Sequence, residues 1–180
     1  MTLSNTNWRG RTITKLCCAL LLAYGASAQT ENLRIHRVDD HLYRGKQPTK
    51  EEIPALARMG IKTVLDLRGG VHKPWERRVV EAAGMRYVRI GLSGIFPPTD
   101  KQMNQILALL DDPEQAPVFI HCRRGADRSG VVIACYRIAH YHWTNAQAWQ
   151  EAREQGFSSL EVLMRRYIQH FTPQPAAVNP

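Results

Sequence analysis

A cysteine and an arginine with five residues between them form the most informative pattern in the chain. The segment reads His121-Cys122-Arg123-Arg124-Gly125-Ala126-Asp127-Arg128-Ser129-Gly130. A short apolar run ends just before it and an apolar helical pattern follows it, so it is predicted to join a strand to a helix. A loop in this position can turn its backbone N–H groups toward one tetrahedral dianion. If that dianion is a phosphate group, the cysteine at the centre of the loop could then attack its phosphorus.

The neighbours of Cys122 favour the thiolate that such an attack requires. The N-terminus of the following helix and the guanidinium of Arg128 should both lower the pKa of the thiol. Arg128 also presents a planar fork that matches two phosphate oxygens, which a lysine cannot do. We therefore predict Cys122 and Arg128 as catalytic residues. The predicted phosphate-binding residues are Arg123, Arg124, Gly125, Ala126, Asp127 and Arg128.

The segment resembles the Cys-x5-Arg signature of the protein tyrosine phosphatase superfamily. The likeness covers about residues 35–170, and the stretches 42–48, 60–68 and 97–99 look like those of bacterial dual-specificity-type phosphatases. This resemblance implies a phosphomonoester hydrolase that works through a cysteinyl-phosphate intermediate, with no metal and no other cofactor. It also implies that Ser129 donates a hydrogen bond to the departing sulfur and that His121 helps to order the loop.

Two aspartates are candidates for the general acid that protonates the leaving group. Many members of the superfamily carry this acid on a loop upstream of the signature, and the only acid in the corresponding stretch here is Asp100. Asp127 lies inside the signature, as in myotubularin-like phosphatases. Asp100 could instead serve the electrostatics of a helix terminus, and Asp127 could hold the loop by a salt bridge or hydrogen bond. Asp127 is the preferred candidate and Asp100 the second.

Alternating short apolar runs and amphipathic segments surround the signature. Strands are predicted at residues 42–44, 61–67, 87–90 and 117–120. Helices are predicted at residues 50–59, 74–83, 101–110, 131–141, 145–155 and 159–171. Capping boxes are predicted for Thr49 with Glu52, Thr144 with Gln147, and Ser158 with Glu161. The alternation predicts an α/β domain with a central, largely parallel sheet flanked by helices and a helical C-terminal part.

The first 28 residues have the pattern of a secretory signal peptide. Basic residues precede an apolar run at 16–24, and Ala26-Ser27-Ala28 offers a cleavage site. The run is short for a membrane span, so we expect no stable membrane anchor. We therefore expect an exported protein, periplasmic or secreted, with a phosphatase domain at 29–172 and a flexible tail at 173–180. Of the four cysteines, Cys122 and Cys135 would remain, and Cys135 is predicted to be a buried hydrophobe.

The charge of the chain favours an anionic partner. The net charge is +8, and it stays positive without residues 1–28. Basic residues are scattered rather than clustered with aromatics, so nucleic acid is not expected as a partner. The histidines show no metal-ligand spacing, so we predict no metal. Two interpretations stay open for Arg44, Lys46, Arg68, Lys73, Arg123 and Arg124: a basic mouth around the site, or solvated surface charges.

The sequence also leaves other functions open. A phosphorylated substrate is expected, either a phosphoprotein or another phosphomonoester such as an inositol phosphate or a phospholipid. A non-enzymatic module that binds phosphate or phosphopeptide would use the same loop. Arsenate reduction would need further cysteines, and sulfur transfer gives no reason for Arg128 with Ser129.

Overall fold

The computed structural model describes residues 34–70 and 74–174 of the chain. These residues belong to one compact unit, Leu33–Pro180. Its strands are β1 (Ile35–Arg37), β2 (Leu42–Lys46), β3 (Thr63–Arg68), β4 (Arg86–Leu92) and β5 (Val118–Cys122). Its helices are α2 (Ile53–Arg58), α3 (Trp75–Ala82), α4 (Asp100–Asp111), α5 (Asp127–Tyr141), α6 (Asn145–Glu154) and α7 (Val162–His170).

The five strands form one sheet in the order β1-β2-β5-β3-β4. β2, β5, β3 and β4 run parallel, and β1 pairs antiparallel with β2 at the edge. The strand that leads into the signature, β5, is therefore central. Its last residues, His121 and Cys122, lie opposite Gly45 and Lys46 of β2, and His121 also lies opposite Asp66 of β3. These residues meet at the carboxyl edge of the sheet, where ligands bind in open α/β folds.

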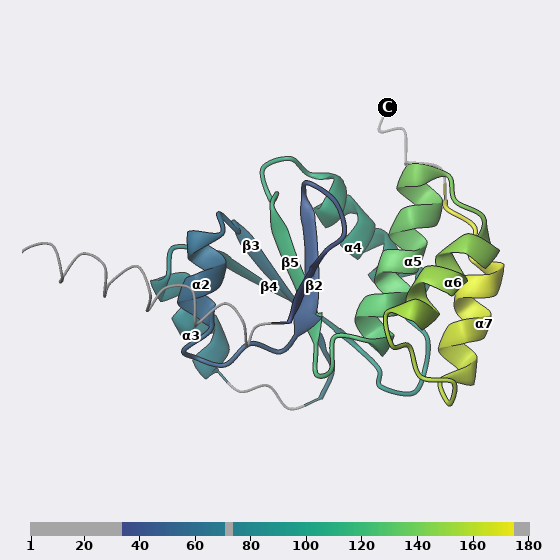
Figure 1. Cartoon of the computed structure of the whole chain (residues 1–180), viewed down its shortest axis with the longest axis horizontal. Coiled ribbons are helices and arrows are strands. Elements are labelled where there is room, and N and C mark those ends of the chain that lie inside the picture. The colour runs from purple at the N-terminus through teal and green to yellow at the C-terminus, as the bar shows by residue number, and fades with distance from the viewer. Residues whose placement is uncertain (1–33, 71–73, 175–180) are drawn as a thin grey trace, which may run out of the picture. The chain divides into compact units, whose positions relative to one another are not determined.

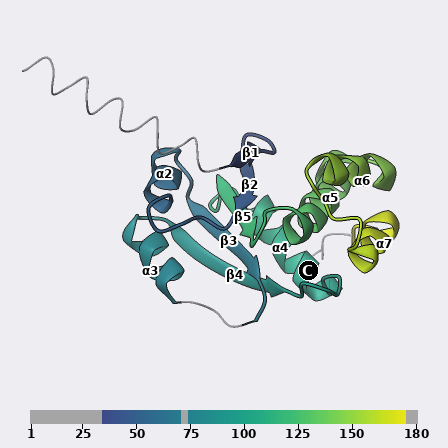
Figure 2. The same cartoon turned by 60° about the horizontal axis from the view of Figure 1, so that its bottom comes forward.

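Helices cover both faces of the sheet (Figure 1), with α2 and α3 on one side and α4 to α7 on the other. The turned view gives the same arrangement (Figure 2). Side chains of β5 alternate between the two resulting cores because successive residues of a strand point to opposite faces. Phe119 packs with Ile53 and Val80, whereas Ile120 packs in the core of α4 and α5. All five residues of β5 are buried, which fixes the strand that carries Cys122.

The predicted fold class is confirmed: a central, largely parallel sheet flanked by helices, with a helical C-terminal part. The four predicted strands are present, and β4 is longer than predicted. Capping boxes at Thr99 with Gln102 and at Thr144 with Gln147 open α4 and α6. The Thr49 and Glu52 hydrogen bonds also form, but they close a turn, and the helix begins only at Ile53.

Two local predictions are wrong, and one strand was missed. Ser158 does not cap a helix: it lies in a turn, and α7 begins at Val162 with no side-chain cap. The helix after the signature begins at Asp127 rather than at Val131, so Arg128 and Ser129 lie in its first turn. The edge strand β1 was not predicted, because its three residues carry no clear alternation and depend on pairing with β2.

Within residues 34–70 and 74–174, no helix is both long and apolar enough to cross a membrane. The predicted signal peptide, Lys73 and residues 175–180 of the predicted tail lie outside the described residues. At the start of that tail, Gln174 accepts a hydrogen bond from Asn104 of α4 at 3.1 Å.

Candidate active site

The loop between β5 and α5 surrounds the sulfur of Cys122. Gly125 adopts the left-handed conformation with φ of +77°, and its N–H donates to Cys122 Sγ at 3.2 Å. A side chain at this position would collide with the backbone of Gly45, because a Cβ would lie 2.4 Å from its carbonyl carbon. Glycine is therefore required for the loop to pass against β2 and to point its amide at the sulfur.

Several neighbours act on the pKa of Cys122. Burial by itself raises the pKa of the thiol. The hydrogen bond from Gly125, the nearby polar groups of Ser129 and the positive charge of Arg128 stabilise the thiolate, and together they bring the pKa below its ordinary value. Burial dominates at Cys135, inside α5, and raises its pKa well above the ordinary value. Of the two cysteines within the described residues, Cys122 therefore has a lowered thiol pKa and Cys135 a raised one.

A pocket of about 480 Å³ opens over Cys122. Its lining consists of Gly94, Cys122, Arg123, Arg124, Asp127, Arg128, Glu161 and Met164. Half of the predicted site residues, Cys122, Arg123, Arg124, Asp127 and Arg128, thus line one pocket. The structure does not bring Asp100 there: Asp100 begins α4 and lines a different hollow, together with Tyr167 and His170.

The carboxylate of Asp127 is engaged on both oxygens. Oδ2 forms an ion pair with the guanidinium of Arg124, and Oδ1 accepts a hydrogen bond from the backbone N–H of Ser158 at 2.9 Å. The second contact ties the turn before α7 to the first turn of α5. Asp127 therefore fastens two segments of the pocket wall, whatever its part in the chemistry.

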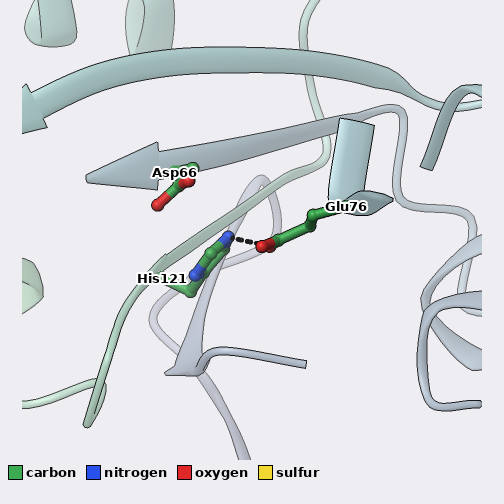
Figure 3. A group of neighbouring side chains, drawn as sticks. All are labelled: Asp66, Glu76 and His121. Atoms are coloured by element: carbon green, nitrogen blue, oxygen red, sulfur yellow. Dashed lines mark ion pairs between the residues drawn. The ribbon is translucent and has the colours of Figure 1, made fainter. Parts of the chain in front are cut away.

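His121 belongs to a buried charged network behind the loop. Glu76 and His121 point toward each other (Figure 3), and Glu76 Oε1 lies 2.9 Å from His121 Nε2, an ion pair when the imidazole is protonated. Arg68 contacts both Glu76 and Asp66, with 2.7 Å from its Nη2 to Asp66 Oδ2. Burial opposes the charge on Asp66, but bonds from Arg68, the electrostatic interaction with His121 and a bond from Tyr87 lower its pKa to about 2.

Asp66, Glu76 and His121 also form the only group of three possible metal ligands within residues 34–70 and 74–174. Their ligand-type atoms lie within 4.8 Å of one another. The guanidinium of Arg68, however, already bridges the two carboxylates. A divalent cation would have to displace this charge, so the donor set fits a metal poorly. The group is better described as an ion-pair network that supports the strand ending in Cys122.

A second, basic pocket shares the lining residues Arg123 and Arg124 with the first. Its volume is about 600 Å³. The basic side chains among its lining residues are those of Arg34, His36, Arg44, Lys46, Arg123 and Arg124, next to the backbone of Gly125 and Ala126. Arg44 is buried and donates to the carbonyl oxygens of Gly125 at 2.7 Å and Ala126 at 3.2 Å. Arg68 of the predicted basic mouth lies instead in the buried network.

Sequence reasoning missed four residues that shape the site. Asp66 could have been found from the sequence: it is the one carboxylate in an apolar strand, and a buried carboxylate needs a partner of opposite charge or a hydrogen-bond donor. Arg44 was noted only as part of a possible basic mouth, and Glu161 only as a helix cap. Glu76 carried no signal, since a glutamate at the start of an amphipathic helix is ordinary.

Known proteins similar to this chain share both its sequence pattern and its fold. Dual specificity protein phosphatase TpbA of Pseudomonas aeruginosa is 27% identical over 139 residues, 73% of this chain and 59% of the relative. Inositol diphosphatase SIW14 of Saccharomyces cerevisiae is 24% identical over 135 residues, 72% of this chain and 48% of the relative. The chain thus spans between about half and three-fifths of the length of these relatives.

Solved structures agree with the fold. The core catalytic domain of SIW14 from S. cerevisiae superposes with a TM-score of 0.69 at 24% identity, over 77% of this chain and 85% of that one. TpbA of P. aeruginosa superposes with a TM-score of 0.68 at 23% identity, over 79% and 87%. The family described as "DSP-PTPase phosphatase fused to NAD+ Kinase" matches residues 6–166. The chain therefore belongs to this family of dual-specificity-type phosphatases within the protein tyrosine phosphatase superfamily.

Proposed function

We propose that the chain is a phosphomonoester hydrolase that acts through a cysteinyl-phosphate intermediate. The observation that carries the proposal is a thiol of lowered pKa at the base of a pocket lined by arginines. Cys122 Sγ attacks phosphorus, and the bond to the leaving oxygen breaks. Water then attacks the phosphocysteine, the S–P bond breaks, and phosphate leaves with the thiolate restored. Arg128 and the loop amides stabilise the charge on the phosphoryl oxygens.

Replacement of the nucleophile tests this proposal. The wild-type protein should hydrolyse an aryl phosphate in the presence of EDTA. Cys122→Ser should abolish turnover and still bind inorganic phosphate, because the arginines and amides remain. Turnover that survives this substitution would refute the mechanism. Phosphate binding by the wild type without any turnover would favour a binding module instead.

The basic pocket favours a substrate with anionic groups besides the reacting phosphate. It shares Arg123 and Arg124 with the pocket of Cys122, so these two side chains can contact a ligand in either pocket. Arg34 and Arg123 have no ion-pair partner among the described residues. SIW14 is named an inositol diphosphatase, and a TpbA structure contains phosphotyrosine. We favour a polyanionic ester such as an inositol polyphosphate over a phosphotyrosyl protein.

A charge-removing variant separates these substrates. Arg34→Ser should raise KM for an inositol polyphosphate about 10-fold, since it removes roughly one favourable charge contact, and should leave KM for p-nitrophenyl phosphate unchanged. Arg78→Ser, on the exposed surface of α3, removes the same charge away from both pockets and serves as the control. Equal effects of Arg34→Ser on both substrates would contradict the polyanion proposal.

We also propose that residues 1–28 direct export and are removed, which leaves a periplasmic or secreted domain. The support is the order of basic residues, apolar run and small-residue cleavage site. The intact mass of the protein recovered from a periplasmic fraction should correspond to a chain that begins at Gln29. Recovery of the full-length chain from the cytoplasm alone would contradict the proposal.

A further inference from the structure

Two carboxyl groups line the pocket over Cys122, those of Asp127 and Glu161. If the chain is the hydrolase proposed above, on which this inference rests, a leaving alkoxide or phenoxide needs a proton from a group within reach of the pocket. The loop that precedes α4 contributes Gly94 and no acid, and Asp100 faces another hollow. The choice of proton donor is therefore between Asp127 and Glu161.

Asp127 is poorly suited to give up a proton. The guanidinium of Arg124 and the N–H of Ser158 each contact one of its oxygens. Both oxygens already act as acceptors in these contacts, so a proton carried by this carboxyl group would have to displace one of the two donors. A group that must be protonated before the reaction and ionised after it should not have both oxygens committed to donors.

The carboxylate of Glu161 is uncommitted. It makes no hydrogen bond and no ion pair within 4 Å with any other residue that the structure describes. Its side chain is half-buried at the wall of the pocket, and its charge acts on Arg124. It is therefore free to hold a proton and to turn toward a bound ester.

The backbone that carries Glu161 is fixed to the catalytic loop. The N–H of Glu161 donates to the carbonyl of Ser158 at 3.2 Å, and the N–H of Ser158 donates to Asp127 at 2.9 Å. Asp127 is in the first turn of α5, immediately before Arg128. A short path of hydrogen bonds thus connects the turn that bears Glu161 to the residues that bind phosphate.

We propose that Glu161 is the proton donor of the reaction and that Asp127 is a positioning residue that holds it in place. As the Cys122 S–P bond forms and the P–O bond breaks, the carboxyl proton of Glu161 passes to the leaving oxygen. In the second step the Glu161 carboxylate accepts a proton from water while the water oxygen attacks phosphorus. The S–P bond then breaks and the thiolate returns.

The dependence on leaving group tests this role. Glu161→Gln should lower kcat/KM for phenyl phosphate by about 100-fold, the lower end of what a general acid contributes. It should lower kcat/KM for p-nitrophenyl phosphate far less, because that leaving group departs without a proton. The decline of kcat/KM at high pH, which reports loss of the acid's proton, should disappear. The charged groups that share the pocket are Cys122, Arg123, Arg124, Asp127 and Arg128.

Three further variants separate the possible outcomes. Glu114→Gln, an exposed position outside both pockets, should change nothing. Asp127→Asn should lower kcat/KM for both substrates alike, as expected when the pocket wall shifts. If instead Asp127→Asn or Asp100→Asn shows the leaving-group-dependent loss and Glu161→Gln does not, the proposal is overturned. Absence of any turnover that depends on Cys122 would reject the hydrolase function itself, which is a different result.

Discussion

Cys122 and Cys135 are both buried, yet their surroundings give them opposite chemistry. Cys122 receives an N–H from Gly125 and lies at the base of a pocket with Arg128. Cys135 is surrounded by apolar side chains within α5, and its pKa is raised by burial alone. Reactivity depends on the thiolate and on access to it, so only Cys122 should react readily.

Alkylation by iodoacetate should therefore be selective. Because the pKa of Cys122 is lowered and that of Cys135 is raised, Cys122 is the more ionised of the two at any given pH, and the arginines attract the reagent's carboxylate. We expect Cys122 to be labelled at least about 10-fold faster than Cys135, as peptide mass spectrometry would measure. Inorganic phosphate should slow the labelling. Equal labelling of the two cysteines would contradict the assigned environments.

Strand β2 supports the catalytic loop by direct backbone contact. A Cβ on Gly125 would approach the Gly45 carbonyl carbon to 2.4 Å, and one on Gly45 would approach the Phe119 ring to 2.9 Å. Arg44, the preceding residue, donates to two carbonyl oxygens of the loop. The shape of the loop therefore depends on an element far away in sequence.

Gly125→Ala should be much more damaging than an equivalent change elsewhere. It introduces strain at positive φ and also forces the loop away from β2, so we expect about a 100-fold loss of kcat/KM. Gly60→Ala is the matched control, because Gly60 has φ of +81° and a Cβ added there would meet nothing within 4 Å. It should cost about 1 kcal/mol of unfolding free energy and leave kcat/KM unchanged. Similar kinetics for both variants would show that the contact with β2 is unimportant.

A buried ion-pair network connects three secondary-structure elements: Asp66 lies in β3, Glu76 in α3 and His121 in β5. Because the pKa of Asp66 falls from an ordinary 3.8 to about 2 on folding, its ionised form stabilises the fold at neutral pH. This contribution, about 2 kcal/mol, is complete above the unfolded pKa and is lost as the pH falls from about 4 toward 2.

Asp66→Asn should therefore lower the free energy of unfolding by an amount that depends on pH. In urea unfolding at pH 7 we expect it to lower the free energy of unfolding by at least about 2 kcal/mol. The difference from wild type should narrow at pH 2.5, where Asp66 of the wild type begins to be protonated. Glu114→Gln, at an exposed position, should show no such trend. A difference that stays constant with pH would mean that the charge of Asp66 is not what stabilises the network.

The sequence pattern correctly predicted those strands and helices that depend on residues close to one another in the chain. The strand–loop–helix around Cys122 and the helices opened by Thr99 and Thr144 depend on residues close in sequence, and they are present. The partners of His121 could not be predicted, because Glu76 reaches it only after α3 has packed on the sheet. The turn at Ser158 was misjudged for a similar reason. The N–H of Ser158 donates to Asp127 of α5 and not to Glu161, so the predicted capping box does not form.

At the scale of the whole molecule, the catalytic loop is held between two cores. Phe119, at the centre of β5, packs in one core, while Ile120 and Cys122 pack in the other. Helix α5, which begins at Asp127, supplies nine buried residues, most of them to the core that contains Cys122. An anion that binds the loop should therefore stabilise the entire fold, since the loop cannot open without disturbing both layers.

Phosphate should raise the melting temperature of the inactive Cys122→Ser variant. At 100 times its dissociation constant, a ligand that binds only the folded state adds about 2.7 kcal/mol, which corresponds to roughly 5–10 °C for a domain of this size. Differential scanning calorimetry with chloride at equal ionic strength separates binding from general salt effects. The melting temperature of each double variant is compared with and without phosphate. In Cys122→Ser with Arg128→Ala most of the rise should be lost, whereas Cys122→Ser with Arg78→Ser should keep it. A shift that persists without Arg128 would place the anion elsewhere on this basic protein.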